Sequence, residues 1–145
     1  MPADKILVVD DERLVRWSLR QKCEEWGYQV LEAEGGEPAL RVAQHESPDL
    51  VLLDVRLPDL SGLEVLARLK HNRDTAKIPV VAVSGLSEKN RQKLMDAGAE
   101  DYLEKNAVIT DKGLNRLPKV LEDVICRINR KRGIPFSPIL EKKGT

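Results

Sequence analysis

The chain has 145 residues, which is enough for one domain and hardly enough for two. Hydrophobic residues make up 41 % and charged residues 33 %, which argues against global disorder. The 24 basic residues balance the 24 acidic ones, so net charge gives no case for a nucleic acid or membrane partner. The charge is uneven, because residues 126–145 hold six Lys or Arg and one Glu, a net of +5, which leaves −5 for residues 1–125.

The two cysteines, Cys23 and Cys126, are too few for a disulfide framework. Both occupy helix-spaced apolar positions, so we expect buried thiols in a reducing compartment. The longest apolar runs have the length of a strand, so the sequence predicts no membrane span. The amino-terminal segment lacks the longer apolar run and the cleavage site of a signal peptide. We therefore expect a cytoplasmic protein.

Strand-like and helix-like segments alternate from residue 5 to about residue 130. A continuous apolar run at residues 6–9 is typical of a strand that is buried on both faces. Apolar residues then recur at steps of three and four and predict the buried face of a helix: Val15, Leu19, Cys23 and Trp26. Charged residues are expected on the opposite, exposed face: Arg16, Arg20 and Glu24. Gly27 stands where this helix should end.

The alternation continues to the last helix. Further strands are predicted at residues 28–33, 50–53, 78–83 and 101–104. Further helices are predicted at residues 37–45, 61–69, 87–97 and about 117–128. Pro38 fits the first turn of its helix, Ser61 and Glu64 form a capping-box pair, and Gly98 follows a helix end. Five strands alternating with five helices predict an α/β protein with a doubly wound parallel sheet.

Polar side chains end most of the predicted strands. The first strand ends in Asp10 and Asp11, the third in Asp54, the fourth in Ser84 and the fifth in Lys105. Doubly wound sheets bind ligands beyond the carboxyl ends of their strands, so these groups are expected to converge in one shallow pocket. Three neighbouring carboxylates repel each other, and Lys105 together with a hard cation, Mg²⁺, would offset that repulsion. Asp54 would be placed to attack a phosphoryl group and form an acyl phosphate.

Four motifs at these strand ends resemble the receiver domain of two-component response regulators. They are residues 6–12 (ILVVDDE), 52–62 (LLDVRLPDLSG), 81–85 (VAVSG) and 98–105 (GAEDYLEK). A lone acidic pair would be weak evidence, whereas four ordered motifs are specific. The resemblance covers residues 4–130 and implies a flavodoxin-like receiver fold with strand order 2-1-3-4-5. Residues 131–145 are then a basic, irregular tail or the remnant of a linker.

The resemblance implies a phosphorylation site and a metal site. Asp54 is similar to the phospho-acceptor, which receives its phosphoryl group from a sensor histidine kinase or a phosphotransfer protein. Asp10 and Asp11 are similar to the acids that bind Mg²⁺ together with Asp54 and the backbone carbonyl of Arg56. Asp10 and Asp11 also suit the first helix as N-cap residues, which we keep as a secondary role.

The resemblance implies a switch as well. Ser84 is similar to the hydroxyl that turns toward the phosphoryl group, and Lys105 to the lysine that pairs with it. Tyr102 is similar to the aromatic residue that moves inward on activation. Phosphorylation would then shift the population of the face made by the fourth helix, fifth strand and fifth helix, and so change binding to a downstream protein. A homodimer through this face is common in the family.

One departure from the family pattern and three function classes remain open. The family usually places proline after the lysine, but Asn106 follows Lys105 here, and a cis bond before a non-proline residue costs about 3 kcal/mol. The leading function is a phosphorylation switch that is no enzyme beyond transferring and losing its own phosphoryl group. An aspartate phosphatase would normally carry a second aspartate at the position of Arg56. A phosphorylation-independent interaction module conflicts with the intact acids, although Asn106 leaves room for it.

The basic run at the chain end admits three interpretations. It comprises Arg127, Arg130, Lys131 and Arg132. These residues could be the solvated end of the last helix, the start of a linker, or a contact for acidic partners or nucleic acid. Because no helix-turn-helix follows, we expect no DNA binding by this chain alone. The sequence leaves open whether the chain is complete or a piece of a larger regulator or hybrid kinase.

Overall fold

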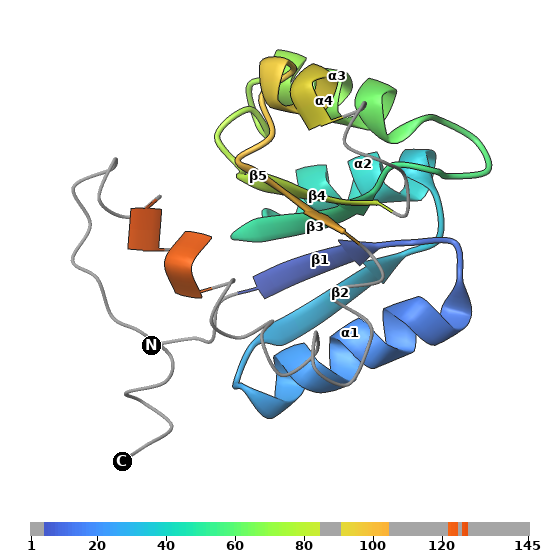
Figure 1. Cartoon of the computed structure of the whole chain (residues 1–145), viewed down its shortest axis with the longest axis vertical. Helices are drawn as coiled ribbons and strands as arrows, with labels where there is room; N and C mark the ends of the chain where they lie inside the picture. The colour runs from blue at the N-terminus through green and yellow to red at the C-terminus, as the bar shows by residue number, and fades with distance from the viewer. Residues whose placement is uncertain (1–4, 85–90, 105–121, 125, 128–145) are drawn as a thin grey trace.

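The computed structural model describes residues 5–84, 91–104, 122–124, 126 and 127 (Figure 1). Strands and helices alternate along it: β1 (Lys5–Val9), α1 (Arg13–Glu25), β2 (Gln29–Ala33), α2 (Gly36–Glu46), β3 (Leu50–Asp54), α3 (Gly62–His71), β4 (Val80–Ser84), α4 (Arg91–Asp96) and β5 (Asp101–Glu104). The described residues between 122 and 127 are helical as well. None of the helices in the described ranges is long and apolar enough to span a bilayer.

The five strands form one parallel sheet in the order β2-β1-β3-β4-β5. This order and the parallel pairing confirm the predicted doubly wound fold. In the centre of the sheet, Val9 of β1 pairs with Ala33 of β2 on one side and with Leu53 of β3 on the other. The next residue along β1 and β3 is an aspartate in each case, so the register brings Asp10 and Asp54 to one edge.

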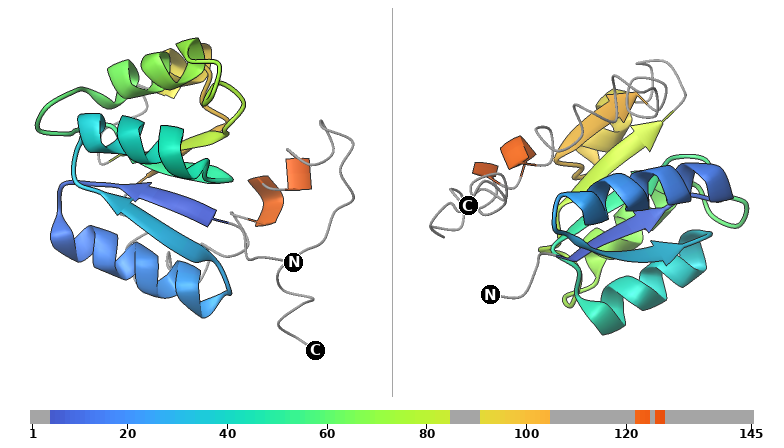
Figure 2. Two further views of the ribbon diagram at one scale, coloured as in Figure 1. Left: turned by 180° about the vertical axis from the view of Figure 1, so that it is seen from behind. Right: turned by 90° about the horizontal axis from the view of Figure 1, so that it is seen from below.

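Helices cover both faces of the sheet. Figure 1 shows α1 below the sheet and α2, α3 and α4 above it, and Figure 2 shows the same two layers from behind and from below. Side chains of β1 alternate between the layers, because Leu7 and Val9 join the α2–α4 side while Ile6 and Val8 join the α1 side. This alternation is the physical reason for the continuous apolar run: both faces of the strand are buried.

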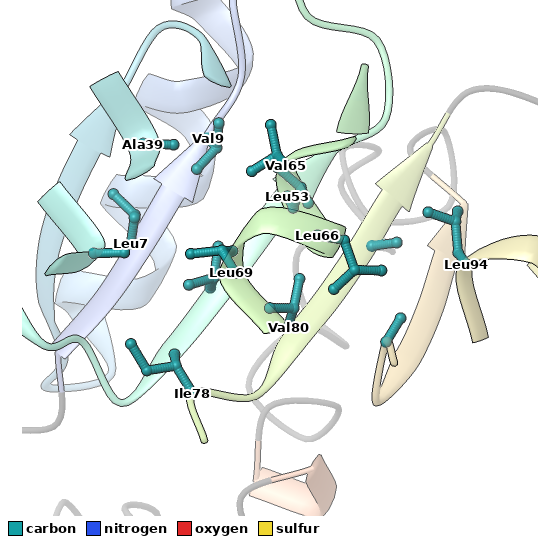
Figure 3. Close-up of a cluster of buried hydrophobic side chains, with 14 of the residues drawn as sticks. Leu7, Val9, Ala39, Leu53, Val65, Leu66, Leu69, Ile78, Val80 and Leu94 are labelled. Atoms are coloured by element: carbon teal, nitrogen blue, oxygen red, sulfur yellow. The ribbon is translucent and has the colours of Figure 1, made fainter. Parts of the chain in front are cut away.

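The larger of the two cores lies under α2, α3 and α4. Figure 3 shows Val65, Leu66 and Leu69 of α3 packed over β3 and β4, with Ile78 and Val80 beneath them. The smaller core holds Val15, Leu19 and Cys23 of α1, as the helical periodicity predicts, together with Val124. Burial raises the pKa of the Cys23 thiol to about 12, so this cysteine stays protonated and inert.

The predicted helix boundaries hold where residue type dictates the backbone. Ser61 is the N-cap of α3, and its Oγ accepts a hydrogen bond from the backbone N–H of Glu64 at 3.1 Å. Pro38 lies in the first turn of α2. Gly27 and Gly98 follow helix ends with φ of 95° and 112°, where a side chain would be strained.

Two predictions about side-chain burial are wrong. Arg16 was expected on the exposed face of α1, but it is buried, because its guanidinium reaches back to the end of β1. Cys126 was expected to be buried, but it is half-buried. It lies two residues after the fully buried Val124, about 200° further around the helix, and therefore faces away from the core.

Several predicted boundaries shift or lie outside the described residues. β4 begins at Val80, and Ile78 precedes it in a turn in which its backbone N–H donates to Thr75. The start of the helix predicted at 87–97 and most of the last helix lie outside the description. The same holds for the tail at residues 131–145, so the domain boundary at residue 130 stays a prediction.

Candidate functional site

Three consecutive acids follow β1 and form what we call the acidic cluster: Asp10, Asp11 and Glu12. Each offers a carboxylate oxygen, and these oxygens lie within 4.8 Å of one another. Asp10 is only 2 % exposed, whereas Asp11 and Glu12 are exposed. Acids this close repel each other, and the cost is largest for the buried one. A cluster of this kind suits a positive ligand better than it suits packing.

Asp10 is held at each of its polar groups. Its backbone N–H donates to the carbonyl of Ala33 at the end of β2, over 3.2 Å. Its backbone carbonyl accepts from Nη1 of Arg16 at 2.7 Å, and its Oδ1 accepts from the backbone N–H of Glu12 at 2.8 Å. The predicted N-cap role of Asp10 and Asp11 is wrong in position, because the N-cap of α1 is Glu12. Asp10 nevertheless satisfies one backbone N–H at this helix start.

Asp54 is the last residue of β3 and is 4 % exposed. Its Oδ1 accepts a hydrogen bond from the backbone N–H of Arg56 at 3.3 Å. Because Leu53 pairs with Val9, Asp54 and Asp10 are the next residues on adjacent parallel strands. The structure therefore brings the predicted phospho-acceptor and the predicted metal-binding acids to the same edge of the sheet.

The loop after Asp54 turns back tightly on itself. Arg56 and Ser61 form an isolated antiparallel bridge, and the N–H of Gly62 donates to the carbonyl of Val55 at 2.8 Å. A Cβ on Gly62 would lie 2.6 Å from the Cα of Val55 and 2.8 Å from the carbonyl oxygen of Asp54. Only glycine allows this approach, so Gly62 fixes where α3 begins relative to Asp54.

Asp59 in this loop caps a different helix. The N-cap of α2 is Gly35, which has no side chain to offer, and the carboxylate of Asp59 accepts from the N–H groups of Gly36 at 2.7 Å and Glu37 at 2.9 Å. The hydrogen bonds from the backbone N–H groups of Glu37 and Gly36 lower the pKa of Asp59 from 3.8 to about 2. The loop after the candidate phospho-acceptor is thereby tied to α2.

The other predicted site residues are described in part. Ser84 ends β4 and pairs with Glu104 of β5, but its side chain lies outside the description, as does Lys105. Tyr102 is a buried residue of β5, as expected of a strand aromatic. Arg56 is exposed beside Asp54. The roles assigned to these four residues stay predictions.

Sequence reasoning missed three residues around the site. Glu12 joins the acidic cluster, and its place as the third consecutive acid was the available signal. Asp59 caps α2 from a distance of 22 residues along the chain, for which the sequence offers only a turn signal after Pro58. Arg16 contacts Asp10, whereas the helical periodicity predicts a solvated position for it, as is usual for a charged residue.

The donor set fits a hard divalent cation. The acidic cluster offers carboxylate oxygens within 4.8 Å of one another, whereas Asp54, which was predicted to share the metal, lies at the same edge of the sheet but outside this cluster. Oxygen ligands of this type are the ones that Mg²⁺ prefers, usually with several waters retained. The chemistry of these residues is therefore compatible with Mg²⁺, and Asp10 and Asp11 are the acids that sequence reasoning named for it.

A parallel sheet in this order, with clustered acids at its carboxyl edge, is the architecture expected of a receiver domain. The family description "Response regulator receiver domain" matches residues 6–113. This chain therefore belongs to the response regulator receiver domain family, whose members act in two-component systems.

Characterised relatives agree with this assignment. The chain is 39 % identical over 106 residues to the phosphate regulon transcriptional regulatory protein PhoB of Pseudomonas aeruginosa, a match that covers 72 % of this chain and 46 % of PhoB. It is 40 % identical over 124 residues to the response regulator MprA of Mycolicibacterium vanbaalenii, covering 86 % of this chain and 48 % of MprA. The chain spans about half the length of the curated relatives it matches.

Solved structures show the same fold. A CheY-like receiver domain protein from Methanospirillum hungatei JF-1 superposes with a TM-score of 0.78 at 25 % identity, covering 89 % of this chain and 98 % of that protein. NtrX from Brucella abortus gives a TM-score of 0.76 at 30 % identity, covering 90 % of this chain and 28 % of NtrX. The fold thus matches both an isolated receiver domain and one within a longer chain.

Proposed function

We propose that this chain is a phosphorylation-activated switch in which Asp54 accepts a phosphoryl group with the help of Mg²⁺. The donor is a sensor histidine kinase or a phosphotransfer protein, and the output is altered binding to a downstream protein. One observation carries the proposal: a carboxylate that is 4 % exposed ends β3, at the edge of the sheet where Asp10 of the acidic cluster follows β1. Buried carboxylates gathered at a ligand-binding edge are costly unless they serve a site.

The chemistry at Asp54 is nucleophilic. Its carboxylate attacks the phosphorus, the bond from phosphorus to the donor's imidazole nitrogen breaks, and an aspartyl phosphate forms while the imidazole leaves. Asp10, Asp11, Asp54 and the backbone carbonyl of Arg56 would hold Mg²⁺, which when bound neutralises charge on the transferring oxygens. The hydrogen bond from the Arg56 N–H to Oδ1 of Asp54 orients this carboxylate for the attack.

The switch follows from the charge that phosphorylation adds. An aspartyl phosphate brings further negative charge and acceptor oxygens to the edge where β3, β4 and β5 end. Ser84 and Lys105 would contact those oxygens. Tyr102, which is already buried on β5, would transmit the change to the face made by the fourth helix, the fifth strand and the fifth helix. Two conformations of that face with different affinity for a partner suffice for signalling.

The alternatives are less well supported by the site. An aspartate phosphatase would need a second acid two residues after the nucleophile, and this position holds the exposed Arg56. A phosphorylation-independent module would keep Asp10 and Asp54 buried at an energetic cost without using them. We therefore also propose that the chain is no enzyme beyond transferring and hydrolysing its own phosphoryl group.

Intact-mass spectrometry after incubation with acetyl phosphate tests the proposal. We expect the wild type to gain one phosphoryl group with Mg²⁺ present and far less with a chelator. Asp54→Asn should gain none. Asp49→Asn is the matched control, because Asp49 stands directly before the same strand at the opposite edge, where it accepts from the backbone N–H of Lys5 at 2.7 Å. Its uptake should equal that of the wild type.

Two outcomes would contradict Asp54 as the phospho-acceptor, and a third would contradict the role of Mg²⁺. Equal uptake by Asp54→Asn would place the phosphoryl group on another residue. No uptake by a folded wild type, either from acetyl phosphate or from a phosphorylated histidine donor, would favour the phosphorylation-independent module. Uptake that is unchanged by the chelator would remove Mg²⁺ from the mechanism while keeping Asp54 as the acceptor.

A further inference from the structure

The described residues bury four polar or charged side chains, and the function proposed above accounts for two of them. Asp10 and Asp54 belong to the candidate site, and the hydroxyl of Thr75 donates to the carbonyl of Leu69 at the end of α3. The fourth is Arg16, which is 7 % exposed. Burying a guanidinium is expensive unless its hydrogen bonds are met, so the contacts of Arg16 show what it does.

The shortest of these contacts reaches the acidic cluster. Nη1 of Arg16 donates to the backbone carbonyl of Asp10 at 2.7 Å, in a buried hydrogen bond. A charged donor makes such a bond stronger than one between neutral groups. The N–H of Asp10 is already fixed by Ala33, so Arg16 completes the hold on the backbone at the residue where the cluster begins.

Two glutamates place the guanidinium. Its Nε lies 3.4 Å from Oε1 of Glu32, and its Nη2 lies 3.4 Å from Oε1 of Glu34. A pocket of about 350 Å³ opens beside them, lined by Arg16, Glu32, Ala33, Glu34 and Pro38. Solvent in this pocket screens the two ion pairs, so they orient the guanidinium but add little stability. The buried bond to Asp10 is the contact with the larger energetic consequence.

We propose that Arg16 is a positioning residue for the acidic cluster: by holding the carbonyl of Asp10 it keeps the three carboxylates arranged for a divalent cation. The inference rests on the function proposed above, since it concerns how that site is built. Residues that form hydrogen bonds to metal ligands commonly change the affinity for the metal, although they do not contact the metal themselves. The positive charge of Arg16 also offsets part of the repulsion among the acids before a cation arrives.

The same helix offers a matched control. Arg20 lies one turn further along α1 and also pairs with Glu32, with Nη1 2.6 Å from Oε2. Its side chain is 44 % exposed, and its Nε pairs with Glu24 at 3.0 Å. Removing Arg20 therefore weakens the link between α1 and β2 without removing the bond to Asp10. An effect that is specific to Arg16 then comes from the contacts that Arg20 lacks, which are the bond to Asp10 and the solvent-screened ion pair with Glu34, and not from the pairing with Glu32.

The first test is a titration with Mn²⁺, a paramagnetic substitute for Mg²⁺. Electron paramagnetic resonance measures the concentration of the free ion at each step. We expect Arg16→Met to bind Mn²⁺ about tenfold more weakly than the wild type, as is usual when an outer partner of a metal ligand is lost. Arg20→Met should bind as the wild type does. Arg16→Lys, which keeps the charge and one donor group, should lie between them, and it provides the comparison if Arg16→Met does not fold.

The second test needs no metal. Amide hydrogen exchange at Glu12, whose N–H donates to Asp10, should be faster in the Arg16 variants than in wild type and Arg20→Met. Equal Mn²⁺ affinity and equal exchange in wild type and both Arg16 variants would overturn the inference. Equal losses in Arg16→Met and Arg20→Met would also overturn it, because the ion pairs with β2 would then be the cause. A wild type that binds no Mn²⁺ would instead contradict the proposed cation site, and the exchange measurement would still test Arg16.

Discussion

The two helices that begin beside the site, α1 and α3, start in opposite ways. The start of α3 is locally stable: Ser61 caps it, and Glu64 in its first turn pairs with Arg68 at 3.1 Å. The start of α1 lacks such support among the described residues, because the side chain of Glu12 makes no capping hydrogen bond and no acid lies in the first turn. Its acids are gathered in the acidic cluster instead.

This difference shows how the chain divides stability and function between neighbouring loops. Near a helix N-terminus, acids normally cap backbone N–H groups and stabilise the helix. At α1 Asp10 does so by accepting from the N–H of Glu12, and the buried Arg16 donates to the backbone carbonyl of Asp10. The usual capping of a helix start by acidic side chains is therefore incomplete at α1, where a ligand is expected. Such a departure from local preference is typical of functional sites.

The largest effect is expected from breaking the start of α3. Gly62→Ala should lower the free energy of unfolding by about 2 kcal/mol or more, because its Cβ would lie 2.6 Å from the backbone of Val55. Urea unfolding measures this. Leu63→Ala is the control, since Leu63 is the exposed next residue, and its loss should be much smaller. Equal losses in the two variants would refute the close approach of α3 to β3.

Removing the cap of α3 should give the next largest effect and should spare the site. Ser61→Ala is expected to lose about 1 kcal/mol of stability, because the N–H of Glu64 loses its acceptor. Ser61→Thr keeps an acceptor oxygen and should lose less. Mn²⁺ affinity should be unchanged in both variants. A loss of affinity as large as that in Arg16→Met would show that the two helix starts are not separate in function.

Removing one charge from the acidic cluster should raise the free energy of unfolding, whereas the two changes above lower it. Asp11→Asn should stabilise the metal-free protein by about 0.5 kcal/mol, because it removes one of three neighbouring negative charges. With Mg²⁺ in excess the wild type should become the more stable of the two, since a ligand of the folded state adds stability. Thermal unfolding with and without Mg²⁺ measures both. Asp74→Asn, an exposed acid after α3, should show no such reversal.

The narrowest effect is confined to acid pH and concerns the start of α2. The pKa of Asp59 is about 2 in the folded protein and 3.8 ordinarily, so its carboxylate stabilises the fold above pH 4. This contribution is lost as the pH falls from about 4 to 2. Asp59→Asn should lack that part of the pH dependence, so the stabilities of the two proteins should converge in acid. Parallel pH profiles would show that Asp59 does not cap α2.

Much of the fold could be predicted because it depends on local patterns. Apolar runs of strand length gave the sheet, steps of three and four gave the buried face of α1, and Ser61 with Glu64 gave the start of α3. The position of Asp10 and Asp54 at one edge followed from the rule that parallel strands end together.

The contacts that were missed join residues far apart in the sequence. The side-chain partners of Arg16 are Glu32 and Glu34, which are 16 and 18 residues away, and helical periodicity carries no information about them. A charged residue beside an apolar stripe is normally solvated. The burial of Arg16 can therefore be predicted only when the pairing of β2 with β1 is known. Asp59 and the N–H groups of α2 are separated in the same way.

The most direct measurement is to identify the residue that carries the phosphoryl group. Borohydride reduces an aspartyl phosphate to homoserine, which remains in the chain and can be located by tandem mass spectrometry. After incubation with acetyl phosphate and Mg²⁺, we expect homoserine at position 54 and at no other acid, Asp10 and Asp11 included. Homoserine elsewhere, or none in a protein that has gained the phosphoryl mass, would contradict the assignment of Asp54 as the acceptor.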